Sequence, residues 1–260
     1  MNDIGTVAWA QRTGGRLTPA QAIGYTLGQL DHQRRRLRAR PRAASPPASP
    51  AAPFVVPDTE LTADIRRYAS ERIPSPILNH SWRVWTWANY LLPTEHGVNS
   101  TLLLAACLLH DAGLSVSTGR GHRRDCFTLR SADLAAQILE RAGTDTDDTL
   151  MVRAAIIGHM NLAPPPGADQ LTTVLHAATH LDVVGAQAQR LPQRLLAATH
   201  AEFPRDGFTT CFSHSFRSEL ISAPFTRAGL SWAVGLPIAL RLNPIARTPK
   251  PDARRTDTQP

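Results

Sequence analysis

The sequence predicts an all-α helical bundle built around one buried helix. Three observations lead to this fold class: an uninterrupted apolar run at residues 102–109, further segments whose apolar residues recur every three or four positions, and capping signals at the segment ends. The chain of 260 residues is 42% hydrophobic and 19% charged, which is ordinary for a globular protein with one substantial core. We therefore expect one main domain with appendages.

The apolar run at residues 102–109 predicts a helix that is buried on all sides and closed by Gly113 in the left-handed conformation. Its last turn nevertheless carries His110 and Asp111. A buried carboxylate costs several kcal/mol unless a cation or hydrogen bonds compensate it. Two explanations stay open from this stretch alone: a metal ion held by both side chains, or a core His and Asp satisfied by neighbouring backbone groups.

An N-terminal amphipathic helix is predicted to begin at Thr18, with Pro19 at its first position and Gln21 three residues after the cap. Its apolar side chains follow one face, which we expect to dock on the core: Ile23, Leu27, Leu30 and Leu37.

Composition divides the chain into three parts. Residues 41–57 contain six Pro among Ala and Ser and predict an extended linker. The last residues are rich in Pro and Arg and predict a disordered tail. The expected parts are an N-terminal helix and linker at 1–57, a main domain at 58–245 and a tail at 246–260.

The positive charge of the chain lies outside the main domain. Residues 1–57 hold eight Arg and two Asp, a net charge of +6, and residues 246–260 hold four Lys or Arg and two Asp, a net charge of +2. The main domain has 16 basic and 17 acidic residues, a net charge of −1. A nucleic-acid enzyme should carry a basic stripe on its binding face, so no specific nucleic-acid partner is expected.

Two further helices carry polar residues on apolar faces. In the helix predicted at 77–92, His80 shares a face with Trp87, and Arg83 lies one turn after His80. In the helix predicted at 170–190, Asp182 occupies a position where helical periodicity calls for an apolar residue. Asp111 presents the same anomaly, and one cation would explain both carboxylates.

Three blocks in order resemble the HD-domain superfamily of metal-dependent hydrolases. They are Asn79-His80-Ser81-Trp82-Arg83, His110-Asp111-Ala112-Gly113-Leu114 and Leu181-Asp182-Val183-Val184-Gly185. The likeness spans roughly 58–205 and is strongest to the cyanamide hydratase-like group. Leu114 stands where phosphodiesterase relatives carry Lys or His. The resemblance implies an HD-type helical bundle and one divalent metal ion, zinc, iron or manganese, held by His80, His110, Asp111 and Asp182.

The resemblance also implies roles around the ion. Asp111 would take a proton from water, and His159, which resembles an extra His of several HD branches, would transfer a proton or position substrate rather than bind the metal. Arg83, Phe127 and Thr128 are the candidate substrate-binding residues, and for Arg83 an equal alternative is that it pairs with a carboxylate of the core. Thr128 stands where the hydratase-like group carries Glu, a departure that bears on whether cyanamide itself is the substrate.

The leading functional prediction is addition of a metal-activated water to a small nitrile-like or C–N compound, or hydrolysis of a related amide. Two alternatives stay open: hydrolysis of a phosphomonoester or nucleotide at the same metal site, and a binding module that keeps the ligands without turnover. The three Cys form no C-x-x-C pair, and the longest apolar run has eight residues, so we expect a cytoplasmic protein without a membrane span. The partner is a small-molecule substrate, and formation of a homo-oligomer is left open.

Overall fold

The computed structural model describes residues 3–38, 54–93, 96–115 and 125–247. Within these ranges the regular structure is entirely helical, and the one β-bridge, between Arg16 and Thr226, is isolated. The predicted all-α class is therefore confirmed. Among the described helices, none is long and apolar enough to cross a membrane.

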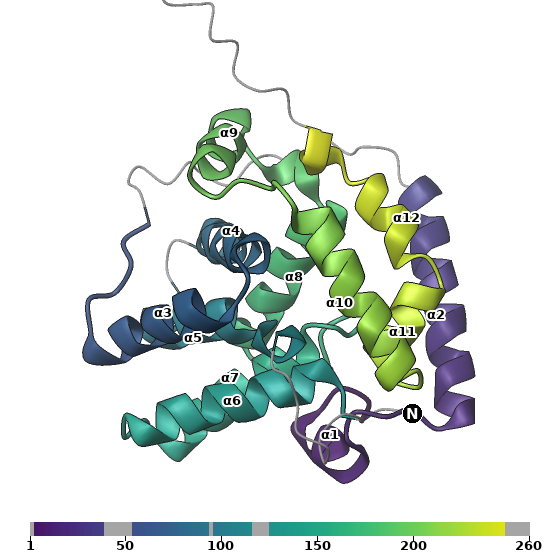
Figure 1. Cartoon of the computed structure of the whole chain (residues 1–260), viewed down its shortest axis with the longest axis horizontal. Coiled ribbons are helices and arrows are strands. Elements are labelled where there is room, and N and C mark those ends of the chain that lie inside the picture. Colours follow the sequence, from purple (N-terminus) through teal and green to yellow (C-terminus); the bar gives the residue numbers. More distant parts are fainter. Residues whose placement is uncertain (1–2, 39–53, 94–95, 116–124, 248–260) are drawn as a thin grey trace, which may run out of the picture.

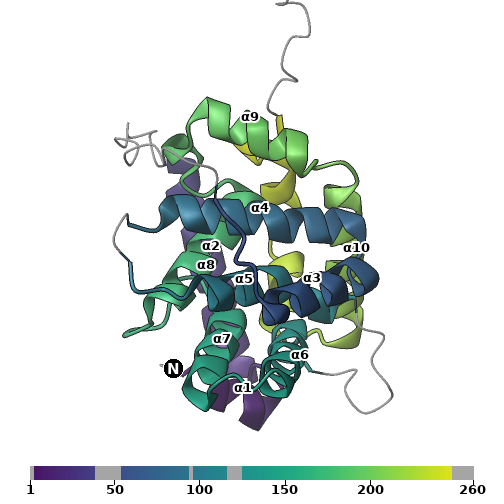
Figure 2. The same ribbon diagram turned by 90° about the vertical axis from the view of Figure 1, so that its left-hand side faces the viewer.

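The predicted buried helix is present as α5 (Ser100–Leu109), and every residue from Leu102 to Leu109 is buried. Five helices contact it: α3 (Glu60–Arg72), α4 (Ser75–Leu91), α6 (Phe127–Arg141), α7 (Thr146–Gly158) and α8 (Gln170–Val184). In Figure 2, α4 lies across the top of this group while α6 and α7 lie below it. A helix with no polar face has to be enclosed in this way, because any open side would expose Leu to water.

The end of α5 differs from its prediction. The helix stops at Leu109, His110 keeps right-handed helical backbone angles, and Ala112–Leu114 forms a short 3-10 helix, η1. Gly113 does not have a positive φ. Glycine is required there for space, because a Cβ atom would lie 2.3 Å from the carbonyl oxygen of Phe127. The close approach packs η1 against the start of α6 and fixes the turn that follows His110.

Polar side chains set the ends of the other helices around the core. Asn99 accepts from the N–H groups of Thr101 and Leu102 at the start of α5, and Asp169 accepts from the N–H of Thr172 at the start of α8. Helix α8 ends at Gly185, whose φ of 70° belongs to the left-handed region that glycine adopts at little cost. These caps fix where the last turn of each helix falls.

The N-terminal segment folds as α1 (Val7–Thr13) and α2 (Pro19–Arg38), and α2 packs against α11 (Arg227–Ala233). The buried face of α2 is not the expected one. Ile23 and Leu27 are 64% and 61% exposed, whereas Tyr25 is buried. Docking through Tyr25 and Gln29 gives the helix hydrogen bonds to α11 that an apolar face could not make.

The C-terminal part adds α9 (Gln193–Glu202), α10 (Phe208–Ser222), α11 and α12 (Leu236–Arg241). Figure 1 shows α2, from the start of the chain, beside α11 and α12 from its end. Most of the predicted Pro-rich linker (39–53) and most of the predicted tail (248–260) lie outside the described residues, and the division at residue 57 stays a prediction.

Candidate metal centre

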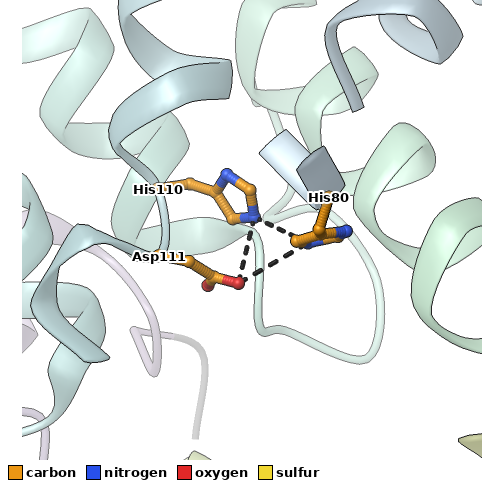
Figure 3. Close-up of side chains that lie close together, drawn as sticks. All are labelled: His80, His110 and Asp111. Atoms are coloured by element: carbon orange, nitrogen blue, oxygen red, sulfur yellow. Dashed lines mark hydrogen bonds and ion pairs between the residues drawn. The ribbon is translucent and has the colours of Figure 1, made fainter. Parts of the chain in front are cut away.

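Three buried side chains converge where α4 and α5 meet. His80 projects from the middle of α4, His110 is the residue that closes α5, and Asp111 follows it. The Nε2 atoms of His80 and His110 lie 3.2 Å apart, and Asp111 Oδ2 lies 3.5 Å from the first and 3.4 Å from the second. Figure 3 shows the three groups turned toward a common point.

The outer nitrogen of each imidazole is held by an acceptor. His80 Nδ1 lies 2.7 Å from Asp182 Oδ2, and His110 Nδ1 lies 2.8 Å from the carbonyl oxygen of Cys107. A carbonyl or an ionised carboxylate can only accept, so each Nδ1 carries the proton and each Nε2 presents a lone pair. In the neutral rings two lone pairs face each other across 3.2 Å with a carboxylate beside them, and they repel unless a proton or a metal ion lies between them. Although burial acts in the opposite direction, Asp111 raises the pKa of His110, so without a metal a proton can fill this place.

The size of this triangle fits a metal ion. The point equidistant from corners separated by 3.2, 3.4 and 3.5 Å lies about 2 Å from each, which is the usual bond length from zinc to imidazole nitrogen or carboxylate oxygen. Neutral imidazoles with a protonated, hydrogen-bonded Nδ1 are also the form in which His binds a metal. His80, His110 and Asp111 therefore fit a divalent cation.

Asp182 lies behind His80 and not among these three groups. Its Oδ1 accepts from Arg83 Nε, Trp87 Nε1 and Arg205 Nη1, each at 2.9 Å, and its Oδ2 accepts from His80 Nδ1 and, at 3.0 Å, from Arg83 Nη2. The sequence predicts one cation that compensates both Asp111 and Asp182, but in the structure only Asp111 lacks a guanidinium partner among the described ion pairs. Two guanidinium groups already neutralise Asp182, so in this structure it orients His80 instead of facing the ion's position.

The electrostatics of the two carboxylates follow from these partners. Burial alone would raise the pKa of Asp182, but the Arg205 and Arg83 guanidinium groups hold it well below its usual range. Burial opposes ionisation of Asp111 as well, yet the His110 imidazole beside it lowers the pKa of Asp111 to about 2. Asp111 is therefore an anion with only imidazoles around it, and it is the carboxylate that calls for a metal.

His159 stands at the edge of the cluster. It closes α7, its Nδ1 donates to the carbonyl oxygen of Ile156 at 2.6 Å, and its Nε2 lies 3.7 Å from Asp111 Oδ1. Burial and the neighbouring His110 lower the pKa of His159 to about 3, so the ring is neutral and offers an Nε2 lone pair. This arrangement suits a group that accepts a proton and passes it on.

A cavity of about 80 Å³ opens beside the cluster. A water molecule needs at least 10–15 Å³ by this measure, so the space suits a few waters or one small molecule. Its lining includes His80, His110, Asp111 and His159 on one side and Gln29 and other residues of α2 on another. Among the residues that the structure describes, no Lys or Arg lines it.

The structure does not bring the three predicted substrate-binding residues to the cavity surface. Arg83 is fully buried, and its guanidinium donates to Asp182 and to the carbonyl oxygens of Phe203 and Pro204. Phe127 is also buried, with its ring centroid 5.8 Å from that of His159. Thr128 Oγ1 donates to Cys126 Sγ and accepts from Arg227 at 3.2 Å. Arg83 therefore contacts the centre through Asp182, Phe127 packs beside His159, and Thr128 bonds to Arg227.

Sequence reasoning missed Arg205 and the contribution of α2. Arg205 lies in the loop between α9 and α10, where no periodic pattern marks a buried role. Its role could have been inferred from Asp182, because a carboxylate on an apolar face needs a compensating cation and a guanidinium can be that cation as well as a metal. Gln29 of α2 was missed because the exposed face of that helix is the apolar one.

Comparison with known proteins agrees with this geometry. Residues 77–187 match the HD domain family, and that range contains His80, His110, Asp111 and Asp182. Two proteins of Saccharomyces cerevisiae, cyanamide hydratase DDI2 and cyanamide hydratase DDI3, are each 28% identical to this chain over 178 residues, or 67% of this chain and 75% of the relative. The HD-type fold and the likeness to cyanamide hydratases expected from three short blocks are therefore confirmed.

Proposed function

We propose that this HD-domain protein is a metal-dependent hydratase or hydrolase that adds water to a small, neutral C–N compound. The observation that carries the proposal is the buried His80, His110 and Asp111 cluster opening into a small cavity, around which the described residues place no Lys or Arg. The similarity to two cyanamide hydratases supports the same class of reaction.

His80, His110 and Asp111 would hold one divalent ion, with zinc, iron and manganese all compatible with two imidazoles and a carboxylate. Such an ion, when bound, lowers the pKa of water towards neutrality and polarises a small electrophile. Asp182 keeps His80 in the tautomer that binds metal, because its Oδ2 accepts the Nδ1 proton at 2.7 Å. Asp182 thus acts through His80.

His159 is placed to move the proton. Adding water across a C≡N bond puts the oxygen on carbon and delivers one proton to nitrogen. The Nε2 lone pair of His159 borders the same cavity as Asp111, so it can take the proton that the water releases and return it to the substrate nitrogen.

The cavity disfavours the phosphohydrolase alternative. A phosphoryl group in its transition state is normally stabilised by several cations or by a second metal ion. Arg83 and Arg205 are both bound to Asp182, and the described residues contain one cluster that could hold a metal, that of His80, His110 and Asp111. A small neutral substrate needs none of these extra charges.

The test is a parallel assay of cyanamide, small nitriles and primary amides against nucleoside monophosphates and a generic phosphate ester. We expect metal-dependent turnover of at least one C–N compound, lost in Asp111→Ala, with little phosphate release. Phosphate release that depends on Asp111, without C–N turnover, would overturn the proposal. No turnover on either panel by fully metal-loaded protein would favour the binding-module alternative.

A further inference from the structure

The wall of the cavity that faces the HD domain comes partly from the N-terminal helix. Gln29, His32 and Gln33 of α2 line the same space as the metal cluster, although α2 lies outside the HD family match at 77–187. Figure 1 shows α2 running past α11 and α12 on the side of the molecule away from α3. The cavity is therefore closed by a helix that the HD domain itself does not supply.

Gln29 is the best anchored side chain of this wall. Its Nε2 donates to Tyr25 Oη at 3.1 Å and to Ser231 Oγ at 2.9 Å. Tyr25 is itself held by its hydroxyl, which donates to the carbonyl oxygen of Met160 at 3.2 Å. These bonds tie α2 to α11 and to the end of α7, and they fix the position of one amide next to the cavity.

The hydrogen bonds also decide which end of the amide is free. With its proton on the Met160 carbonyl, Tyr25 Oη accepts from Gln29 Nε2, and the Ser231 hydroxyl, 3.0 Å away, is a second group that can donate to it. Both N–H groups of Gln29 are then used, one toward Tyr25 and one toward Ser231. Among the hydrogen bonds of the described residues, Gln29 Oε1 receives none, so this half-buried residue of the cavity lining has an acceptor to offer.

We propose that Gln29 is a specificity-determining residue that accepts an N–H hydrogen bond from substrate, and that the substrate class is a small neutral compound with an amino group on the reacting carbon. The proposal rests on the function proposed above and deepens it. Across the cavity, the cluster and His159 would face the carbon and the nitrogen that receives the proton. A cyanamide or a primary amide has both features: an electrophilic carbon and an N–H group beside it.

A site that hydrogen-bonds an N–H group discriminates against an analogue without it, because the acceptor then loses its partner in the bound complex. Cyanamide and dimethylcyanamide form such a pair of probes. Binding of each is measured by titrating cobalt(II)-loaded protein and following the visible absorption of the metal, and turnover is measured separately as kcat/KM. Gln29→Leu removes the acceptor at similar size, and Leu27→Ala, on the exposed face of the same helix, is the matched control.

We expect the preference of the wild-type protein for cyanamide over dimethylcyanamide to fall about tenfold in Gln29→Leu, the size of one lost hydrogen bond. Metal content should stay at the wild-type value, Tm should fall because the bonds of Gln29 to Tyr25 and Ser231 are lost, and Leu27→Ala should match wild type throughout. Ser231→Ala, which removes one of the two anchors of the amide, should give a smaller fall in the same direction. This second variant keeps the test open if Gln29→Leu does not fold.

The proposal is overturned if Gln29→Leu and Ser231→Ala both keep the wild-type preference, or if wild-type protein binds neither probe. Failure of the proposed function gives a different result. If wild-type protein binds cyanamide at the metal but turns over no C–N compound, the proposed reaction is wrong. The titrations with cyanamide and dimethylcyanamide still show in that case whether Gln29 accepts a hydrogen bond from the N–H group.

Discussion

His80 donates through Nδ1 to Asp182 Oδ2 across 2.7 Å, and the other nitrogen of the same ring faces His110. The His80 imidazole thus lies between two carboxylates. The charge of Asp182 is compensated by Arg83 and Arg205, whereas Asp111 has no Lys or Arg partner among the described ion pairs. Substitution of Asp182 should therefore affect mainly the stability of the fold, and substitution of Asp111 mainly the binding of metal.

The first prediction concerns metal content. Purified protein should hold about one transition-metal ion per chain, and His110→Ala should lose it, because removal of His110 leaves two of the three converging ligands. Elemental analysis measures this directly, with His214→Ala as a control at an exposed position. Wild-type protein that stays metal-free after incubation with zinc, iron and manganese salts would contradict the site.

The second prediction separates support from ligation at Asp182. Asp182→Asn leaves the Arg83 and Arg205 guanidinium groups without their carboxylate, so the metal-free protein should lose roughly 3–5 kcal/mol of unfolding free energy. Denaturant unfolding of metal-free wild-type and variant protein gives the difference. A carboxylate that served only as a metal ligand would leave the metal-free stability unchanged.

The third prediction concerns His159. His159→Ala should keep the metal, because its Nε2 is not one of the three converging atoms, and should abolish most C–N turnover. The measurements are elemental analysis and kcat on the same sample. Loss of metal in step with activity would instead make His159 a ligand, the role set aside in the sequence-based prediction.

The fourth prediction concerns Arg227, a fully buried cation whose described partners are neutral. Its guanidinium donates to Asn161 Oδ1, Thr128 Oγ1 and the carbonyl oxygen of Ile157, and it lies 5.2 Å from the ring centroid of Trp9. Arg227→Met would leave these buried acceptors unpaired, at a cost of roughly 1–3 kcal/mol for each one that finds no water. The Tm should therefore fall well below that of Arg217→Met, a change at an exposed arginine. Equal melting temperatures would show that the acceptors find other donors.

The fifth prediction is that a chain beginning near Pro57 still binds one metal ion, because His80, His110 and Asp111 all come later in the sequence. It should nevertheless be less stable and associate more, since removing α1 and α2 uncovers the surfaces that bury Trp9 and Tyr25. Elemental analysis and size-exclusion chromatography measure the two effects. A truncated chain without metal would mean that α2 holds the cluster together as well as covering it.

The sequence predicts the parts of this structure that follow from periodicity and from apolar composition. The buried helix α5 and the inward positions of His80, His110 and Asp111 all follow from a carboxylate or imidazole standing on an apolar face. These features depend on local spacing, which one sequence is enough to read.

The rest depends on contacts between distant segments. The compensation of Asp182 by Arg205 and the docking of α2 through Tyr25 are both outcomes of tertiary packing. Periodicity predicted that Ile23 and Leu27 would be buried, but the free energy of the docked helix is set by the hydrogen bonds that the opposite face makes. A hydrophobic stripe marks a helix reliably, yet it does not say which side meets the core.

The contact between Tyr25 and Ser231 joins residues 206 positions apart, near the two ends of the described chain. Such a contact carries a larger loop-closure entropy than any within the cluster, where His80 and His110 are 30 positions apart. A nascent chain emerges N-terminal end first, so α2 must wait for α11 before it can dock. During synthesis, affinity for metal should therefore appear before selectivity for substrate, because the three ligands and Asp182, which orients His80, are complete by residue 182 and the wall is complete only after residue 231.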